Sequence, residues 1–385
     1  MPRCALGAAA LTVAAATAAV APAAHAAVDL DLLFVGNSYT YQVVGYDGSL
    51  SGDNTYADRN FDDLRVSPFE AIVGAYGASL ASSQNVAIPG RKLSQHAGFD
   101  GPTQTDRQTL LYLNNFELLD PTDPQGHDFD VIVLQELSSL PGTAIKKSSN
   151  NSDFIDFFNE GLETIVNQIK SKNPDARIVL YNTWARETDA LAQASGFTSR
   201  ADMAQKTNDA YAIAQQYITA PTNSNVVVNP NATLQGLGYG GPVDIAPAGQ
   251  AFEAWIADAW YANNLAGTFG NALDLIYDND GNGDPDNVSH PAIAGEFLAA
   301  SVLFESIYGV STLSLIQQGL LTQQSLNSLF TQNDVGGYSG TTSLNLQLAT
   351  YLAGLSGRTT GIPEPATLGI AALGLAALGR RRRAA

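Results

Sequence analysis

Short apolar runs that alternate with helix-like stretches are the feature of this sequence that most constrains its fold. Buried strands are expected at residues 29–36, 85–88, 130–134 and 176–181, with a fifth at either 226–228 or 243–246. Helices are expected from 67 onward and at 153–172, 200–218 and 292–308. Strands that alternate with helices form a parallel sheet covered by helices on both faces. The pattern therefore predicts an α/β fold with its chemistry at the carboxyl ends of the strands.

Composition narrows the classes of protein that remain. Hydrophobic residues make up 45% of the 385 residues and charged residues 15%, which is enough apolar content for a large packed core. The formal net charge of −18 argues against nucleic acid as a partner, because phosphate binding needs clustered Lys and Arg. The single cysteine is Cys4.

The first 26 residues have the layout of a secretory signal peptide. Arg3 supplies the positive charge, and residues 5–24 are almost entirely small or apolar. Ala24-His25-Ala26 fits the small-x-small cleavage pattern, so the mature chain is expected to begin at Ala27. Export would remove Cys4, which excludes disulfides, a cysteine nucleophile and cysteine-based zinc sites from the mature protein.

The opposite end of the chain has a second sorting pattern. Pro363-Glu364-Pro365 precedes an apolar run at 366–378 and four arginines at 380–383. The apolar run is shorter than the roughly 20 residues that span a bilayer comfortably. The arrangement resembles a PEP-CTERM signal, which implies a transmembrane tail recognised and removed by a membrane transpeptidase, an exosortase. The expected division is a signal peptide at 1–26, a catalytic domain at 27–310, a helical extension at 311–358 and a sorting tail at 359–385.

One serine directly follows the first expected strand. Gly36-Asn37-Ser38 places Ser38 on the turn into the next helix, at the carboxyl edge of the sheet. Backbone N–H groups at a helix start can bind an oxyanion, so this position suits a nucleophile. Imidazole is the side chain best suited to remove the serine proton near neutral pH. His96, His127 and His290 are the histidines left after export; His96 is a candidate to line the cleft near Gly90, and His127 falls in a polar loop.

The motifs from Gly36 onward resemble those of SGNH/GDSL hydrolases. The resemblance covers roughly residues 29–308 and implies a three-layer, flavodoxin-like SGNH hydrolase fold with a five-stranded parallel sheet in the order 2-1-3-4-5. It implies Ser38 as nucleophile, Gly90 and Gln135 as oxyanion donors, and His290, followed by Pro291, as general base. Gln135 departs from the usual asparagine of the family by one methylene. The family would place an aspartate at position 287, where this chain has Asn287.

The sequence therefore leaves more than one candidate for the acidic residue of the triad. Asp286 is the expected carboxylate partner of His290, Asp284 is the alternate, and Asn287 could orient the ring through its amide oxygen. The same stretch is a candidate calcium loop, with Asp278, Asp280, Asn282 and Asp284 as ligands. The spacing and Gly283 resemble an EF-hand loop, but Ser289 stands where the bidentate glutamate would be. Serine chemistry itself requires no cofactor.

These observations predict an exported carboxylic-ester hydrolase of the cell envelope or extracellular space. Its expected substrate is an acyl ester, with the O-acetyl groups of an extracellular polysaccharide as a candidate. Two alternatives stay open: a non-catalytic surface or matrix protein on a degenerate SGNH fold, and a lipase or phospholipase. The displaced acid favours the former, whereas the polar insertion at 41–64 lacks the apolar face that a lipase lid would need.

Overall fold

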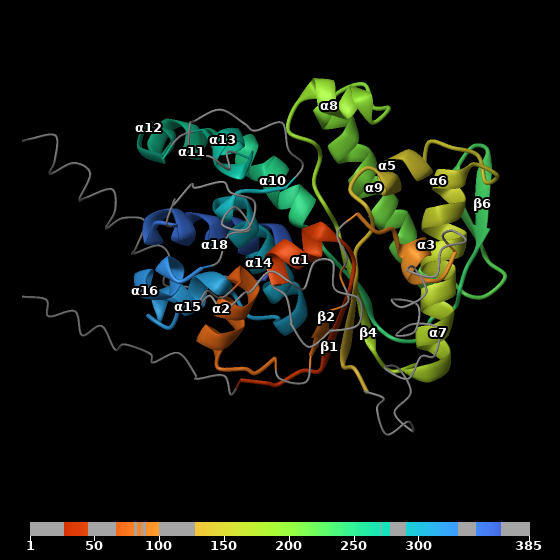
Figure 1. Ribbon diagram of the computed structural model, residues 1–385, viewed down its shortest axis with the longest axis horizontal. Helices are drawn as coiled ribbons and strands as arrows, with labels where there is room; N and C mark the ends of the chain where they lie inside the picture. The colour runs from red at the N-terminus through yellow and green to blue at the C-terminus, as the bar shows by residue number, and fades with distance from the viewer. Residues whose placement is uncertain are drawn as a thin grey trace, which may run out of the picture.

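The computed structural model describes residues 27–44, 67–80, 83–85, 87, 90–99, 128–269, 271–277, 290–329 and 344–362. A parallel sheet in the order β2-β1-β3-β4-β7 runs through the middle of the molecule (Figure 1). Its strands are β1 (Leu32–Val35), β2 (Gln84–Asn85), β3 (Val131–Leu134), β4 (Arg177–Tyr181) and β7 (Val243–Ala246). The expected α/β architecture and strand order are confirmed. Four strands have full length, and the fifth, β2, has two residues.

The choice between two candidate fifth strands is settled in favour of 243–246. The alternative at 226–228 lies in β5 (Asn225–Asn229), which pairs antiparallel with β6 (Ala232–Gln235) outside the main sheet. Burial alternates along β5, and Val227 is 65% exposed. A strand with one solvent-exposed face is typical of an antiparallel hairpin, whereas the inner strands of a parallel sheet are covered on both faces.

Alternate residues of each long strand serve two separate hydrophobic clusters. Leu32 and Phe34 of β1 face one cluster, and Leu33 and Val35 face the other. Every residue of β1 and β3 is buried, which explains why these strands are continuous apolar runs. The register aligns Val35 with Leu134, so β1 and β3 end side by side at the same edge.

Helices cover both faces of the sheet (Figure 1). The first cluster is built with α1 (Ser38–Val44), α2 (Pro68–Tyr76), α10 (Ala248–Ile256), α11 (Ala259–Asn264), α12 (Ala266–Phe269), α13 (Ala272–Tyr277), α14 (Ile293–Tyr308), α15 (Thr312–Gln317), α16 (Gln323–Asn327) and α18 (Leu346–Thr360). The second is built with α3 (Leu93–His96), α5 (Leu140–Ala144), α6 (Ser152–Phe154), the π-helical segment η2 (Ile155–Glu163), α7 (Thr164–Lys172) and α9 (Arg200–Thr219), and α8 (Asp189–Ala194) packs on α9.

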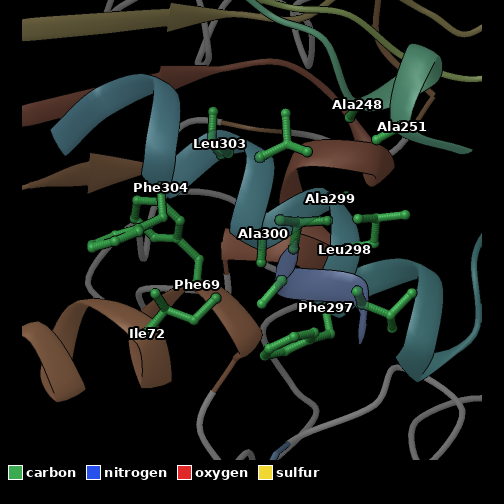
Figure 2. Packing of buried hydrophobic residues seen from close by; sticks show 14 of the residues in the cluster. Phe69, Ile72, Ala248, Ala251, Phe297, Leu298, Ala299, Ala300, Leu303 and Phe304 are labelled. Atoms are coloured by element: carbon green, nitrogen blue, oxygen red, sulfur yellow. The ribbon is translucent and has the colours of Figure 1, made fainter. Parts of the chain in front are cut away.

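Helix α14 is buried along nearly its whole length and organises the first face. Phe297, Leu303 and Phe304 of this helix belong to the same buried cluster as Phe69 and Ile72 of α2, and Figure 2 shows Phe304 close to Phe69. Helices α15, α16 and α18 contribute to the same cluster, so the described part of the expected C-terminal extension packs onto the sheet-bearing core. This packing fixes the start of α14, where His290 lies.

Local signals in the sequence account for several helix ends. Ser67 caps α2 in a capping box with Glu70, as the Ser-Pro-Phe-Glu order predicts. The helix expected at 153–172 is present, with η2 as its middle part. A Cβ at Gly161 of η2 would meet the Leu93 Cβ at 3.0 Å, so glycine permits the close approach of η2 to α3.

Candidate functional site

Two residues 252 positions apart meet at the carboxyl edge of the sheet. Ser38 begins α1 three residues after β1 ends, and His290 lies three residues before α14. The Ser38 Oγ and the His290 Nε2 are 2.7 Å apart. At this separation the imidazole can accept the serine proton directly. The structure therefore brings together the two residues that the sequence predicted as nucleophile and base, and their catalytic roles stay predictions.

Burial keeps the His290 ring in the neutral form that a base requires. The pKa of His290 is lowered to about 4, first by burial and then by the positive charge of Arg186. The ring lies 5.2 Å from the Tyr39 ring, centroid to centroid. Tyr39 in turn packs edge-on against Trp184 at 4.8 Å. These contacts limit the orientations open to the imidazole.

The turn that carries Ser38 is held by two buried side chains. Asn37 donates its backbone N–H to Gln135 Oε1 at 2.9 Å, and the Thr40 hydroxyl donates to the same oxygen at 2.9 Å. His96 Nε2 lies 2.7 Å from the Gly36 carbonyl oxygen. A Cβ at Gly36 would meet Gln135 Oε1 at 2.8 Å and collide with Thr40, so the turn closes only around glycine.

Gln135 thus has a structural task besides the one expected from sequence. Its side-chain carbonyl oxygen accepts the two hydrogen bonds from the turn that carries Ser38, and its amide nitrogen donates a hydrogen bond to the Glu136 carbonyl oxygen. The side chain is completely buried. Gln135 therefore supports the Ser38 turn from β3, and its service as an oxyanion donor stays a prediction.

The loop that holds Gly90 is tied to the same turn. Asn37 Nδ2 donates to the Arg91 carbonyl oxygen at 3.0 Å. Gly90 has a φ of +78°, a left-handed conformation that favours glycine. The space beside it is open, since a Cβ added at this residue would have no atom within 4 Å. Gly90 is thus next to the nucleophile turn in space, as the expected oxyanion role requires.

Two buried groups of this region have functions that sequence reasoning did not assign. Glu136 accepts the backbone N–H groups of Leu93 and Leu137, and burial raises the pKa of its carboxyl to about 8. It thereby fixes the loop after Gly90. Burial also lowers the pKa of His96 to about 4, so His96 is neutral and donates from Nε2 to the Gly36 carbonyl. The position of Glu136, two residues after an apolar strand, was the available signal.

Arg186 was also missed. It follows β4 at the same edge of the sheet, where its charge reaches His290. The sequence offered no motif around this residue.

The acidic stretch before His290 lies outside the described residues. This applies to Asp286, Asp284 and Asn287 as triad partners, and to Asp278, Asp280 and Asn282 as calcium ligands. Within the part of the chain that the structure describes, no group of three or more His, Cys, Asp or Glu could hold a metal ion. The triad acid and the calcium loop stay predictions.

One segment of the chain matches a known sequence family. Residues 361–383 match the PEP-CTERM protein-sorting motif. This sorting signal is thereby confirmed. No curated protein matches the sequence. In the described ranges no helix is long and apolar enough to cross a membrane, and the apolar run at 366–378 lies outside them.

Three solved structures have a backbone path similar to that of this chain. A DUF4886 family protein from Bacteroides uniformis is 13% identical, covering 88% of this chain and 96% of its own, with a TM-score of 0.49. A candidate SGNH hydrolase from Slackia heliotrinireducens is 18% identical over 72% of this chain and 99% of its own, with a TM-score of 0.40. A candidate GDSL-like lipase from Parabacteroides merdae is 14% identical over 72% and 95%, with a TM-score of 0.36.

Proposed function

We propose that this protein is an exported serine esterase that cleaves acyl esters. The 2.7 Å contact between Ser38 Oγ and His290 Nε2 carries the proposal. A serine at a strand-to-helix turn, paired with a buried neutral imidazole, is the arrangement that acyl transfer needs. A surface or matrix protein without activity would have no need for this pair.

The reaction follows from the positions of these groups. Ser38 Oγ attacks the acyl carbonyl carbon while its proton moves to His290 Nε2. The tetrahedral oxyanion is stabilised by backbone N–H groups of the Ser38 turn and the Gly90 loop, which lie next to each other. Collapse expels the alcohol, which takes the proton from His290. Water then attacks the acyl-enzyme with His290 again as base, which releases the acid and regenerates Ser38.

Export and processing belong to the same proposal. The PEP-CTERM motif at 361–383 supports delivery to the cell envelope or beyond and recognition by an exosortase-type enzyme. The first 26 residues are the proposed signal peptide. An esterase placed there would meet extracellular polysaccharide, so O-acetyl groups on such polymers are the proposed natural substrate.

Covalent labelling tests the nucleophile directly. The purified protein should react with a fluorophosphonate probe and hydrolyse short p-nitrophenyl esters, because both need only an activated serine. Ser38→Ala should lose both, whereas Ser148→Ala, at an exposed serine, should lose neither. Undiminished labelling of Ser38→Ala would overturn the assignment.

The triad acid is tested by three matched variants. We propose that Asp286 partners His290, so Asp286→Ala should lower kcat/KM by about 10²-fold or more, given the larger cost of disabling a triad aspartate elsewhere. Asp284→Ala and Asn287→Ala should have much smaller effects. A loss confined to Asn287→Ala would assign the position to the amide, and a loss confined to Asp284→Ala would assign it to the alternate carboxylate.

A further inference from the structure

We propose that Glu136 is a positioning residue of the esterase site: its carboxyl group holds the Gly90 loop (residues 90–93) at the distance from Ser38 that the oxyanion hole needs. This inference rests on the proposed esterase function and assigns a further residue to it. In this role Glu136 acts through the backbone of the loop, whose N–H groups are proposed oxyanion donors, rather than by touching the substrate.

Two consecutive residues after β3 hold the two halves of the site. Gln135 accepts hydrogen bonds from the turn that carries Ser38. Glu136, the next residue, accepts the backbone N–H of Leu93, which lies 3.2 Å from Oε1 and 3.1 Å from Oε2. The end of one strand therefore sets the spacing between the Ser38 turn and the Gly90 loop.

Glu136 is itself fixed by two further hydrogen bonds. Its Oε1 accepts the backbone N–H of Leu137 at 2.6 Å, and its own backbone N–H donates to the Tyr211 hydroxyl of α9 at 3.3 Å. The whole residue is buried. A side chain held in this way can keep the loop in one position, whereas an exposed side chain would exchange rapidly between rotamers.

The Gly90 loop is short, so a change at Leu93 is felt at Gly90, three residues earlier. Asn37 of the nucleophile turn holds the loop through the Arg91 carbonyl oxygen, at 3.0 Å, and Glu136 holds it through the Leu93 N–H. Loss of the Glu136 bond would loosen the Leu93 end of the loop. A displacement of about 1 Å at a catalytic group can cost about 10²-fold in rate.

A carboxyl group is a costly choice for this buried position. Burial raises the pKa of Glu136 to about 8, well above the ordinary range of glutamate. A buried polar group lowers stability unless its hydrogen bonds are made. An apolar side chain would fill the same space at lower cost, so the carboxyl is explained by the N–H groups that it holds.

A pair of substrates that differ in one atom tests this role. p-Nitrophenyl thionoacetate carries sulfur in place of the carbonyl oxygen of p-nitrophenyl acetate. Sulfur accepts weaker hydrogen bonds than oxygen, so the ratio of kcat/KM for the oxygen ester to kcat/KM for the thionoester measures the help given by the oxyanion donors. Glu136→Met fills the space of the side chain without a strong acceptor. It should lower kcat/KM for the oxygen ester by about 10- to 100-fold and the ratio by about 10-fold.

Two further variants separate positioning from stability. Glu136→Gln keeps an oxygen that can accept the Leu93 N–H, so its ratio should lie between those of wild type and Glu136→Met. Glu305→Met is the matched control, because Glu305 is another buried glutamate that accepts a backbone N–H, that of Thr312. It should lower stability and leave the ratio unchanged. An unchanged ratio in Glu136→Met, or in Glu136→Gln if the Met variant does not fold, would overturn the proposal, and so would an equal fall in Glu305→Met.

Hydrogen exchange measures the loop without any substrate. Exchange in peptides that cover residues 90–93 should quicken in Glu136→Gln, whereas peptides that cover β7, which β4 separates from β3, should keep their wild-type rates. Unchanged exchange at 90–93 would overturn the proposal. A wild-type protein that hydrolyses neither ester would refute the esterase and, with it, the catalytic meaning of this contact. Hydrolysis with an unchanged ratio in the Glu136 variants would refute the role of Glu136 alone.

Discussion

His96 is a fully buried group whose titration should leave a clear mark on stability. The folded protein holds the pKa of His96 at about 4 because the ring is fully buried, whereas an exposed histidine has a pKa near 6.5. Between pH 6.5 and 4 the unfolded chain binds a proton that the folded chain refuses. The contribution of His96 to the free energy of unfolding should therefore fall as the pH is lowered through this range and level off below pH 4.

The size of the effect follows from the two pKa values. Each pKa unit corresponds to about 1.4 kcal/mol, so a change from 6.5 to about 4 amounts to about 3 kcal/mol. His96→Gln removes the titrating ring and should remove this part of the acid sensitivity. The mutant will be less stable than wild type at pH 7, where the bond to the Gly36 carbonyl is lost or weakened, by about 1–3 kcal/mol. The difference between the two proteins should shrink as the pH falls to 4.

Urea unfolding at a series of pH values measures this directly. Trp184 and Trp255 are fully buried and report unfolding by fluorescence. His127→Gln is the control, because it removes a histidine at a position that the sequence predicts to be a polar loop and that lies outside the described residues. Parallel stability curves for wild type and His96→Gln between pH 7 and 4 would refute the reasoning, because they would mean that His96 takes up its proton equally in both states.

Three further predictions concern the nucleophile turn, the α14–α18 contact and the tail. Gly36→Ala should lower esterase activity and destabilise the fold by about 1–3 kcal/mol, because the added Cβ would meet Gln135 Oε1 at 2.8 Å. Gly240→Ala is the control, because a Cβ there would have open space around it. Equal activity and equal urea stability of the two variants would count against the turn geometry. Glu305→Ala should lower the free energy of unfolding in urea by about 1–3 kcal/mol, because the buried Thr312 N–H and the Ser356 hydroxyl lose their acceptor. Glu305→Gln should lower it by less. Unchanged stability of Glu305→Ala would contradict this account. The intact mass of the protein purified from its native host should correspond to a chain without Arg380–Arg383. A mass that still includes these residues would reject removal of the sorting tail.

Most of the sheet, and the two residues predicted as nucleophile and base, could be recognised from the sequence alone. A continuous short apolar run is typical of an inner strand of a parallel sheet, because such a strand is buried on both faces. Strands β1, β3 and β4 were therefore predictable. Ser38 and His290 were found because each adjoins an element whose start is marked locally, by Gly36 for one and Pro291 for the other. The PEP-CTERM signal is linear and needs no fold to be recognised.

The surroundings of Ser38 and His290 depend on contacts between distant segments, which the sequence did not reveal. The choice between 226–228 and 243–246 depended on which segment lies beside β4, a contact between residues more than 60 positions apart. The bond from His96 to the Gly36 carbonyl joins positions 60 apart, and the bonds of Gln135 to the same turn join positions about 100 apart. The charge of Arg186, a residue that follows β4, lowers the pKa of His290, a residue that precedes α14. Burial and charge at such sites are properties of the packed chain, because local spacing carries no information about which distant segments exclude water or pair their charges.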